Sequence, residues 1–211
     1  MDPLHWKKPR KIFLGSMTDL FHPLVPFGLL DQIFAIVALC QQHTFQILTK
    51  RPERMKEYFD TSTNNPMADI SIWANSISEG QYSVMGNKLP LPNLWIGVTA
   101  ENQACADKRI PILLQIPAAV RFVSIEPMLG LVDLNKYNLI REDWKKWMGS
   151  TIETYLDWVI CGPENGKIKR ECNIDWEIDL YRQCKETNTA FYCKNDIGLP
   201  KEFPTWANND Y

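Results

Sequence analysis

The sequence predicts an α/β fold built on a six-stranded parallel sheet. Three observations support this class: short apolar runs recur along the 211 residues, segments with helical periodicity separate them, and polar residues follow each run. Strands that alternate with helices predict parallel pairing with right-handed crossovers. From these patterns alone, the six strands fit either an open doubly wound sheet or an incomplete barrel.

The six predicted strands are short and rich in Val, Ile, Phe and Trp. Runs that are apolar almost throughout are typical of strands buried on both faces, as in parallel sheets. The predicted strands are residues 11–15, 44–48, 94–98, 120–125, 156–161 and 190–193.

The segments between them have helical features. Leu30, Phe34 and Val37 follow the i, i+3, i+4 spacing of one helix face. Pro52 suits the first turn of a helix, and Asn173 suits an N-cap. The predicted helices are residues 27–42, 51–59, 102–116 and 173–187, with shorter ones at 67–76 and 141–148.

The chain is predicted to be a single α/β domain over residues 1–211. Residues 60–93 interrupt the alternation, because this stretch is polar and too long for an ordinary connection between a helix and a strand. We expect it to be an inserted irregular excursion.

Composition excludes several classes of protein. Hydrophobic residues make up 45% of the chain and charged residues 23%, which argues against disorder. The net charge of −2 gives no strong nucleic-acid signal, and no apolar run is long enough for a membrane span. Six cysteines without a CxxC pair indicate a reducing compartment, so we expect a cytoplasmic protein, in the host cytoplasm if it is phage-encoded.

Polar residues follow every predicted strand, where parallel α/β folds bind ligands. Polar loops and helix caps explain any one of these segments, but three carboxylates and two lysines on one rim favour a ligand site. The predicted rim residues are Ser16, Thr18, Asp19, Thr49, Lys50, Arg51, Thr99, Glu101, Asn102, Ser124, Glu126, Gly162, Glu164, Asn165 and Lys194.

Three cysteines have positions that could bring them together. Cys161 and Cys193 end neighbouring predicted strands, and Cys172 precedes the next helix. Thiolates bind zinc and iron–sulfur clusters. Because the spacing matches no metal motif, we expect buried, inert thiols and no metal site.

Five segments carry a family resemblance: KKPRKIFLGSMTDLFHP, HTFQILTKRPERM, LPNLWIGVTAENQ, ADKRIPILLQIPAAVRFVSIEPMLG and DWVICGPENG. In this order they resemble a phage-associated family of unknown function that is grouped with the radical SAM enzymes. The similarity runs from about residue 6 to residue 194. It implies a partial, open TIM-type barrel that binds S-adenosylmethionine beside a [4Fe–4S] cluster.

One feature of that family is missing here. Its three-cysteine cluster loop lies upstream of the segment that resembles WKKPRKIF, and this sequence begins at that point. We therefore expect that this chain alone does not hold the cluster or initiate radical chemistry, and whether it is an enzyme stays open. It is a fragment, or another polypeptide supplies the missing part, or the protein has kept the barrel for binding.

The resemblance predicts a truncated or cluster-less protein that binds S-adenosylmethionine or a related nucleotide-like ligand at the rim. By position, Ser16, Thr18 and Asp19 suit the methionine amino group, and Glu126 or Glu101 suits the ribose. Two other functions compete: a phage-encoded counter-defence protein that captures a metabolite or a host protein, and a Mg²⁺-dependent nuclease or lyase that uses the rim carboxylates.

Lys50 or Arg51 suits the ligand's carboxylate or a substrate phosphate, and residues 162–165 suit the adenine side. The substrate, the reaction and the oligomeric state are not determined by the sequence.

Overall fold

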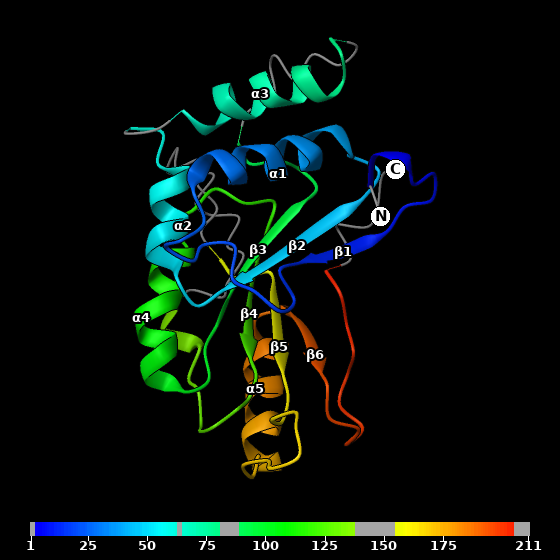
Figure 1. Ribbon diagram of the computed structural model, residues 1–211. Coiled ribbons are helices and arrows are strands. Elements are labelled where there is room, and N and C mark those ends of the chain that lie inside the picture. The colour runs from blue at the N-terminus through cyan, green and yellow to red at the C-terminus, as the bar shows by residue number, and fades with distance from the viewer. Residues whose placement is uncertain (1–2, 63–64, 81–88, 138–154, 205–211) are drawn as a thin grey trace, which may run out of the picture. The chain divides into compact units, whose positions relative to one another are not determined.

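The computed structural model describes residues 3–62, 65–80, 89–137 and 155–204 (Figure 1). The helix predicted at 141–148 lies outside these residues. The elements in chain order are the 3₁₀ turn η1 (Pro3–His5), β1 (Lys11–Leu14), α1 (Phe27–Leu39), β2 (Thr44–Thr49), α2 (Pro52–Phe59), α3 (Pro66–Ile77), β3 (Leu94–Thr99), α4 (Gln103–Leu113), β4 (Val120–Ile125), η2 (Asn135–Tyr137), β5 (Trp158–Cys161), α5 (Ile174–Glu186) and β6 (Ala190–Cys193).

The six strands form one parallel sheet in the order β1-β2-β3-β4-β5-β6. This confirms the predicted fold class. A doubly wound sheet would reverse its strand order at a switch point, whereas a sequential order with helices between the strands is the topology of a partial TIM-type barrel. The sheet is open, because β1 and β6 are its two edges.

The chain divides into two compact units, and the division falls within β3. The first unit contains residues 1–96 and 116–119, and the second contains residues 97–115 and 120–210. The single domain expected over residues 1–211 stays a prediction.

An aromatic cluster forms much of the core of the first unit. Phe27, Phe34 and Phe59 surround Tyr58, with ring centroids 4.9–5.3 Å from the Tyr58 ring. The buried Tyr58 hydroxyl donates a 2.8 Å hydrogen bond to Asp31 Oδ1, which satisfies its only donor inside the core. The apolar face predicted for α1 is therefore the face that packs.

The 60–93 segment contains one helix, α3, close to the predicted bounds 67–76. Asn65 caps it by accepting a hydrogen bond from the backbone N–H of Ala68, and Pro66 occupies the first turn. In Figure 1, α3 lies alongside α1, so the excursion adds a second helical layer within the first unit.

The strands of the second unit are the most deeply buried. Every residue of β4 is buried, and Phe122 on β4 contacts Trp158 on β5 with ring centroids 5.5 Å apart. A Cβ atom added at Gly97 on β3 would lie 2.6 Å from the Phe122 ring. The ring therefore occupies the space that a side chain at position 97 would need.

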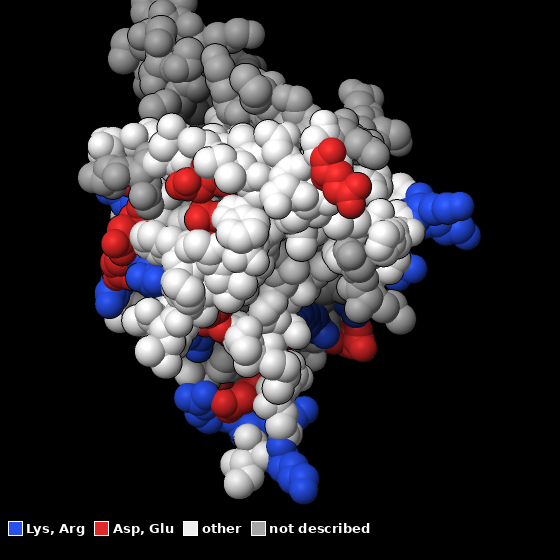
Figure 2. Space-filling model, turned by 45° about the horizontal axis from the view of Figure 1, so that its top comes forward, with Lys and Arg blue, Asp and Glu red and all other residues white. Residues whose placement is uncertain are grey.

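The described residues contain no helix with the length and apolar character needed to cross a bilayer. On the face shown in Figure 2, basic and acidic side chains are interspersed, and residues of other kinds cover most of the area. This face presents no continuous basic field of the kind that binds nucleic-acid backbones.

We predict that Gly97→Ala destabilises the protein by about 1–3 kcal/mol, because the new methyl group overlaps Phe122 in a packed core. The matched control is Gly28→Ala on α1, where an added Cβ meets nothing within 4 Å. Urea unfolding of both variants measures the difference. Equal stabilities would contradict the close packing of β3 against β4.

Candidate functional site

The register of β4, β5 and β6 brings the ends of three strands together in the second unit. Ile125 pairs with Cys161, and Cys161 pairs with Cys193. The next residue on each strand is Glu126, Gly162 or Lys194, and hydrogen bonds continue the ladder from Gly162 N to Ile125 O and from Lys194 N to Cys161 O. Successive residues point to opposite faces of a sheet, so this row lies on the face opposite the two cysteines.

Glu126 and Lys194 form an ion pair across Gly162. Lys194 Nζ lies 2.5 Å from Glu126 Oε2, and Asn165 Nδ2 donates to Glu126 Oε1 at 3.1 Å. A Cβ atom at Gly162 would lie 2.9 Å from Lys194 Cβ and 3.6 Å from its Cγ, so the lysine side chain lies over the glycine. The lack of a side chain at Gly162 therefore lets two strands that are not neighbours share a charge pair.

The other two rim carboxylates of this unit have cations of their own. Arg109 Nη1, from α4, donates to Glu101 Oε2 at 2.8 Å and to the carbonyl of Thr99 at 2.7 Å. Arg170 donates to Glu164 through its backbone N–H and its guanidinium, which hold the pKa of that carboxyl at about 2. Each rim carboxylate is thus matched with a positive charge.

Asn102 and Ser124 have structural contacts. The Asn102 side chain accepts a hydrogen bond from Cys105 N and caps α4. Ser124 is buried on β4, and its carbonyl accepts from Ala100 N. These two predicted rim residues support the loops that carry Glu101 and Glu126.

In the first unit, Asp19 accepts hydrogen bonds from three other predicted rim residues. It accepts hydrogen bonds from Thr49 Oγ1 at 2.7 Å, Arg51 Nη1 at 2.7 Å, and the backbone N–H groups of Phe21 and Lys50. Burial by itself would raise the pKa of Asp19, but these hydrogen bonds outweigh it and hold the pKa below its usual value. The carboxylate therefore ties the loop after β1 to the end of β2.

Ser16 and Thr18 are exposed in the same loop and are not among the hydrogen-bond donors to the Asp19 side chain. Lys50 contributes its backbone to Asp19, and its side chain is exposed. The hydrogen bonds and ion pairs thus join Asp19 with residues 49–51 in the first unit and Glu126 with Asn165 and Lys194 in the second, while Glu101 and Glu164 have separate partners.

Arg109, Arg170 and Glu177 are functional candidates that the sequence patterns do not predict. Arg109 lies two helical turns beyond Glu101, a spacing that signals a possible contact only once the helix is known to fold back on its own N-terminal loop. Arg170 lies in an irregular loop with no periodicity. Glu177 has the pattern of an ordinary acidic residue in a first helical turn.

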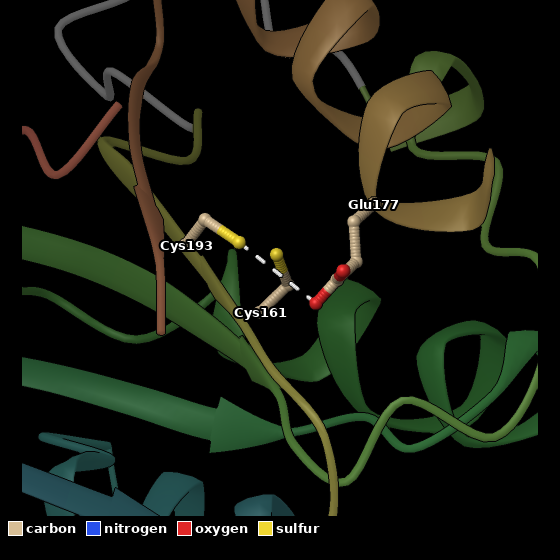
Figure 3. A group of neighbouring side chains, drawn as sticks. All are labelled: Cys161, Glu177 and Cys193. Carbon is tan, nitrogen blue, oxygen red and sulfur yellow. Dashed lines mark hydrogen bonds between the residues drawn. The ribbon is translucent and has the colours of Figure 1, made fainter. Parts of the chain in front are cut away.

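A second cluster lies on the other face of the same strand ends. The ligand atoms of Cys161, Cys193 and Glu177 all lie within 4.8 Å of one another, and all three residues are buried (Figure 3). The predicted proximity of the two cysteines is confirmed. Burial raises the pKa of the Cys161 thiol, and the adjacent Cys193 and Glu177 raise it further.

The described residues do not fit a [4Fe–4S] cluster. Such a cluster is held by cysteine thiolates, whereas the one close group of metal-binding side chains in the described ranges has two thiols and a carboxylate. None of the rim carboxylates belongs to a group of this kind within the described ranges. We derive no chemistry through an iron–sulfur cluster or a rim magnesium ion.

The chain was compared with known families, curated proteins and solved structures. A family model described as "Protein of unknown function (DUF5131)" matches residues 1–201. No curated protein and no solved structure matches the chain. The predicted resemblance to a family of unknown function is therefore confirmed, while its phage association and its relation to radical SAM enzymes stay predictions.

We predict that Asp19→Ala lowers the free energy of unfolding by about 1–3 kcal/mol at pH 7, because the buried Thr49 hydroxyl and two backbone N–H groups lose their acceptor. Since folding holds the pKa of Asp19 below the unfolded value of about 3.9, this contribution is complete above that pH and is lost as the pH falls through the folded-state pKa. Urea unfolding from pH 7 to pH 3 measures both effects.

The control for this prediction is Asp175→Ala, an exposed carboxylate at the start of α5. It should cost less than about 1 kcal/mol. A difference between wild type and Asp19→Ala that stays constant down to pH 3 would contradict the role assigned to the charged carboxylate.

Proposed function

The chain belongs to the DUF5131 family of unknown function, and on that premise we propose that it binds S-adenosylmethionine or a related nucleotide-like ligand at the ends of β4, β5 and β6. The observation that carries the proposal is the Glu126–Lys194 pair across Gly162. It places an anionic acceptor and a cationic donor side by side on a strand-end rim, where parallel α/β folds bind their ligands.

The donor set suits the polar parts of such a ligand. The Glu126 carboxylate has the acceptors that ribose hydroxyls and an amino group need. Lys194 has three N–H donors, the contact with Glu126 uses one of them, and 47% of its side chain is exposed, so it can also bind a carboxylate or a phosphate. Asn165 holds Glu126 from the other side.

The loop after β5 suits the base of the ligand. Gly166 is exposed, and a Cβ atom there would meet nothing within 4 Å. Close approach to exposed backbone is the usual reason for glycines beside nucleotides. We assign residues 162–166 to the adenine side of the ligand.

The site in the second unit changes the roles proposed for two other residues. Glu101 forms an ion pair with Arg109, and only 13% of its side chain is exposed. We therefore propose that Glu101 positions the rim and that Glu126 binds the ribose. Asp19 is committed to four donors within the first unit. Its proposed role is to hold the loop that presents Ser16 and Thr18.

The wider proposal is a radical-SAM-like barrel protein that is phage-encoded and works in the host cytoplasm. The five motif segments carry this part of the proposal, and the sequential parallel strand order is compatible with it. A counter-defence protein that captures its ligand would use the same rim. Turnover separates the two roles: an enzyme converts the bound ligand into products that mass spectrometry detects, whereas a capture protein releases it unchanged.

We predict that Lys194→Met and Glu126→Gln each raise the dissociation constant for S-adenosylmethionine at least about tenfold, which is about 1.4 kcal/mol. Isothermal titration calorimetry on metal-free protein measures these dissociation constants. S-adenosylhomocysteine and ATP, run in parallel, show whether the sulfonium methyl group or a phosphate matters.

The matched control is Lys201→Met, because Lys201 forms an exposed ion pair with Asp196 in the same unit and has a similar exposed fraction, 45%. It should bind like the wild type. Equal affinities for Lys194→Met and Lys201→Met, or no binding of any nucleotide by the wild-type protein, would overturn the proposed site.

A further inference from the structure

The buried cluster of Cys161, Cys193 and Glu177 has no role in the proposed ligand site. Packing of the core does not by itself require a carboxylate there. The two cysteines are register partners at the ends of β5 and β6, and Glu177 reaches them from the first turns of α5 (Figure 3). All three side chains have 0% exposure. Buried carboxylates are rare unless they are paired with a charge or a metal ion.

The charge of this cluster is unbalanced among the residues that the structure describes. Glu177 Oε2 accepts from Asn195 Nδ2 at 3.1 Å, and Glu177 Oε1 faces Cys193 Sγ at 3.8 Å. Neither partner is a cation, and no ion pair to Glu177 occurs in the described ranges. A weak thiol donor and one amide are modest compensation for a fully buried carboxylate.

The spacing of the cluster suits one tetrahedral ion. Zn–S bonds of about 2.3 Å and Zn–O bonds of about 2.1 Å at tetrahedral angles place sulfur about 3.6 Å from oxygen and about 3.8 Å from a second sulfur. The observed contact between Cys193 Sγ and Glu177 Oε1 is 3.8 Å, and all three ligand atoms lie within 4.8 Å of one another. Only small movements would bring them to these distances.

A third thiol lies beside this group. Partial burial and the neighbouring Glu177 carboxylate raise the pKa of Cys172 to about 11, and Cys193 adds to the effect. Cys172 is two residues before Ile174, the start of α5, and its sulfur does not belong to the group of ligand atoms that lie within 4.8 Å of one another. It is therefore a neighbour of the cluster and not one of its three ligands.

We propose that Cys161, Cys193 and Glu177 bind a thiophilic divalent cation, with Zn²⁺ as the expected ion. Binding replaces the two thiol protons, which are released to solvent, and the cation then contacts the carboxylate and both thiolates directly. Asn195 holds the second oxygen of Glu177, as an outer partner of a ligating carboxylate does. Thiolate ligands exclude Mg²⁺ and Ca²⁺, which require oxygen.

The metal site does not depend on the proposed ligand site. Cys193 and Lys194 are consecutive residues, so their side chains point to opposite faces of the sheet. Cys161, the register partner of Cys193, lies on the same face as Cys193. The zinc ion would join β5, β6 and α5 from the helix side, which is a structural role. It replaces the expectation that these cysteines are inert.

The test uses the full chain, purified, stripped of metal under reducing conditions and titrated with ZnCl₂ or CoCl₂ alone. The expected result is one metal ion per chain, a sulfur-to-cobalt charge-transfer band in the near ultraviolet, and a higher melting temperature with Zn²⁺. Cys193→Ser should abolish stoichiometric binding, and Glu177→Gln should weaken it at least about tenfold.

The matched control is Cys184→Ala, which removes a buried thiol from the same helix as Glu177 but outside the cluster. It should keep the metal and the cobalt band. A wild-type protein that shows no cobalt–thiolate band, or that forms a Cys161–Cys193 disulfide while binding no metal when reduced, would overturn the proposal even if the variants fail to fold. Loss of binding in Cys184→Ala equal to that in Cys193→Ser would overturn it too.

Discussion

Both candidate sites depend on the hydrogen-bond register of β4, β5 and β6. Because Ile125, Cys161 and Cys193 are partners in one row, the two thiols lie side by side on one face of the sheet. The next row then places Glu126, Gly162 and Lys194 together on the other face. A slip of one residue in β6, which carries Cys193 and leads into Lys194, would exchange its faces, separating the thiols and breaking the ion pair at once.

Gly162 has a particular role in this arrangement. β5 lies between β4 and β6, so any side chain on it would stand between Glu126 and Lys194. With hydrogen in that place, the lysine stem crosses the middle strand and its ammonium reaches the carboxylate at 2.5 Å. The glycine itself is buried beneath the lysine stem, so it permits the charge pair, and the exposed Gly166 is the residue left for the proposed approach of a ligand.

Electrostatic pairing limits what the rim residues can do. Glu101, Glu126 and Glu164 each contact a different cation, which leaves no group of carboxylates sharing a site in the part of the chain that is described. Such preformed pairs hold the loops in place and lower the cost of ordering them when a ligand binds. The buried cluster has the opposite character, because its carboxylate faces thiols and an amide instead of a cation.

The sequence by itself determined the fold class, because near-continuous apolar runs and helical spacing depend on local composition. All six strands were located from it to within about two residues, and Asn173 was identified as the cap that the structure shows. It also determined that polar residues follow each strand, and that Cys161 and Cys193 end neighbouring strands. Only the tertiary structure decided which of these residues meet: Arg109, Arg170 and Glu177 reach their partners through helix packing and an irregular loop. No sequence period encodes such contacts, since they depend on how whole elements stack and not on the spacing within one element.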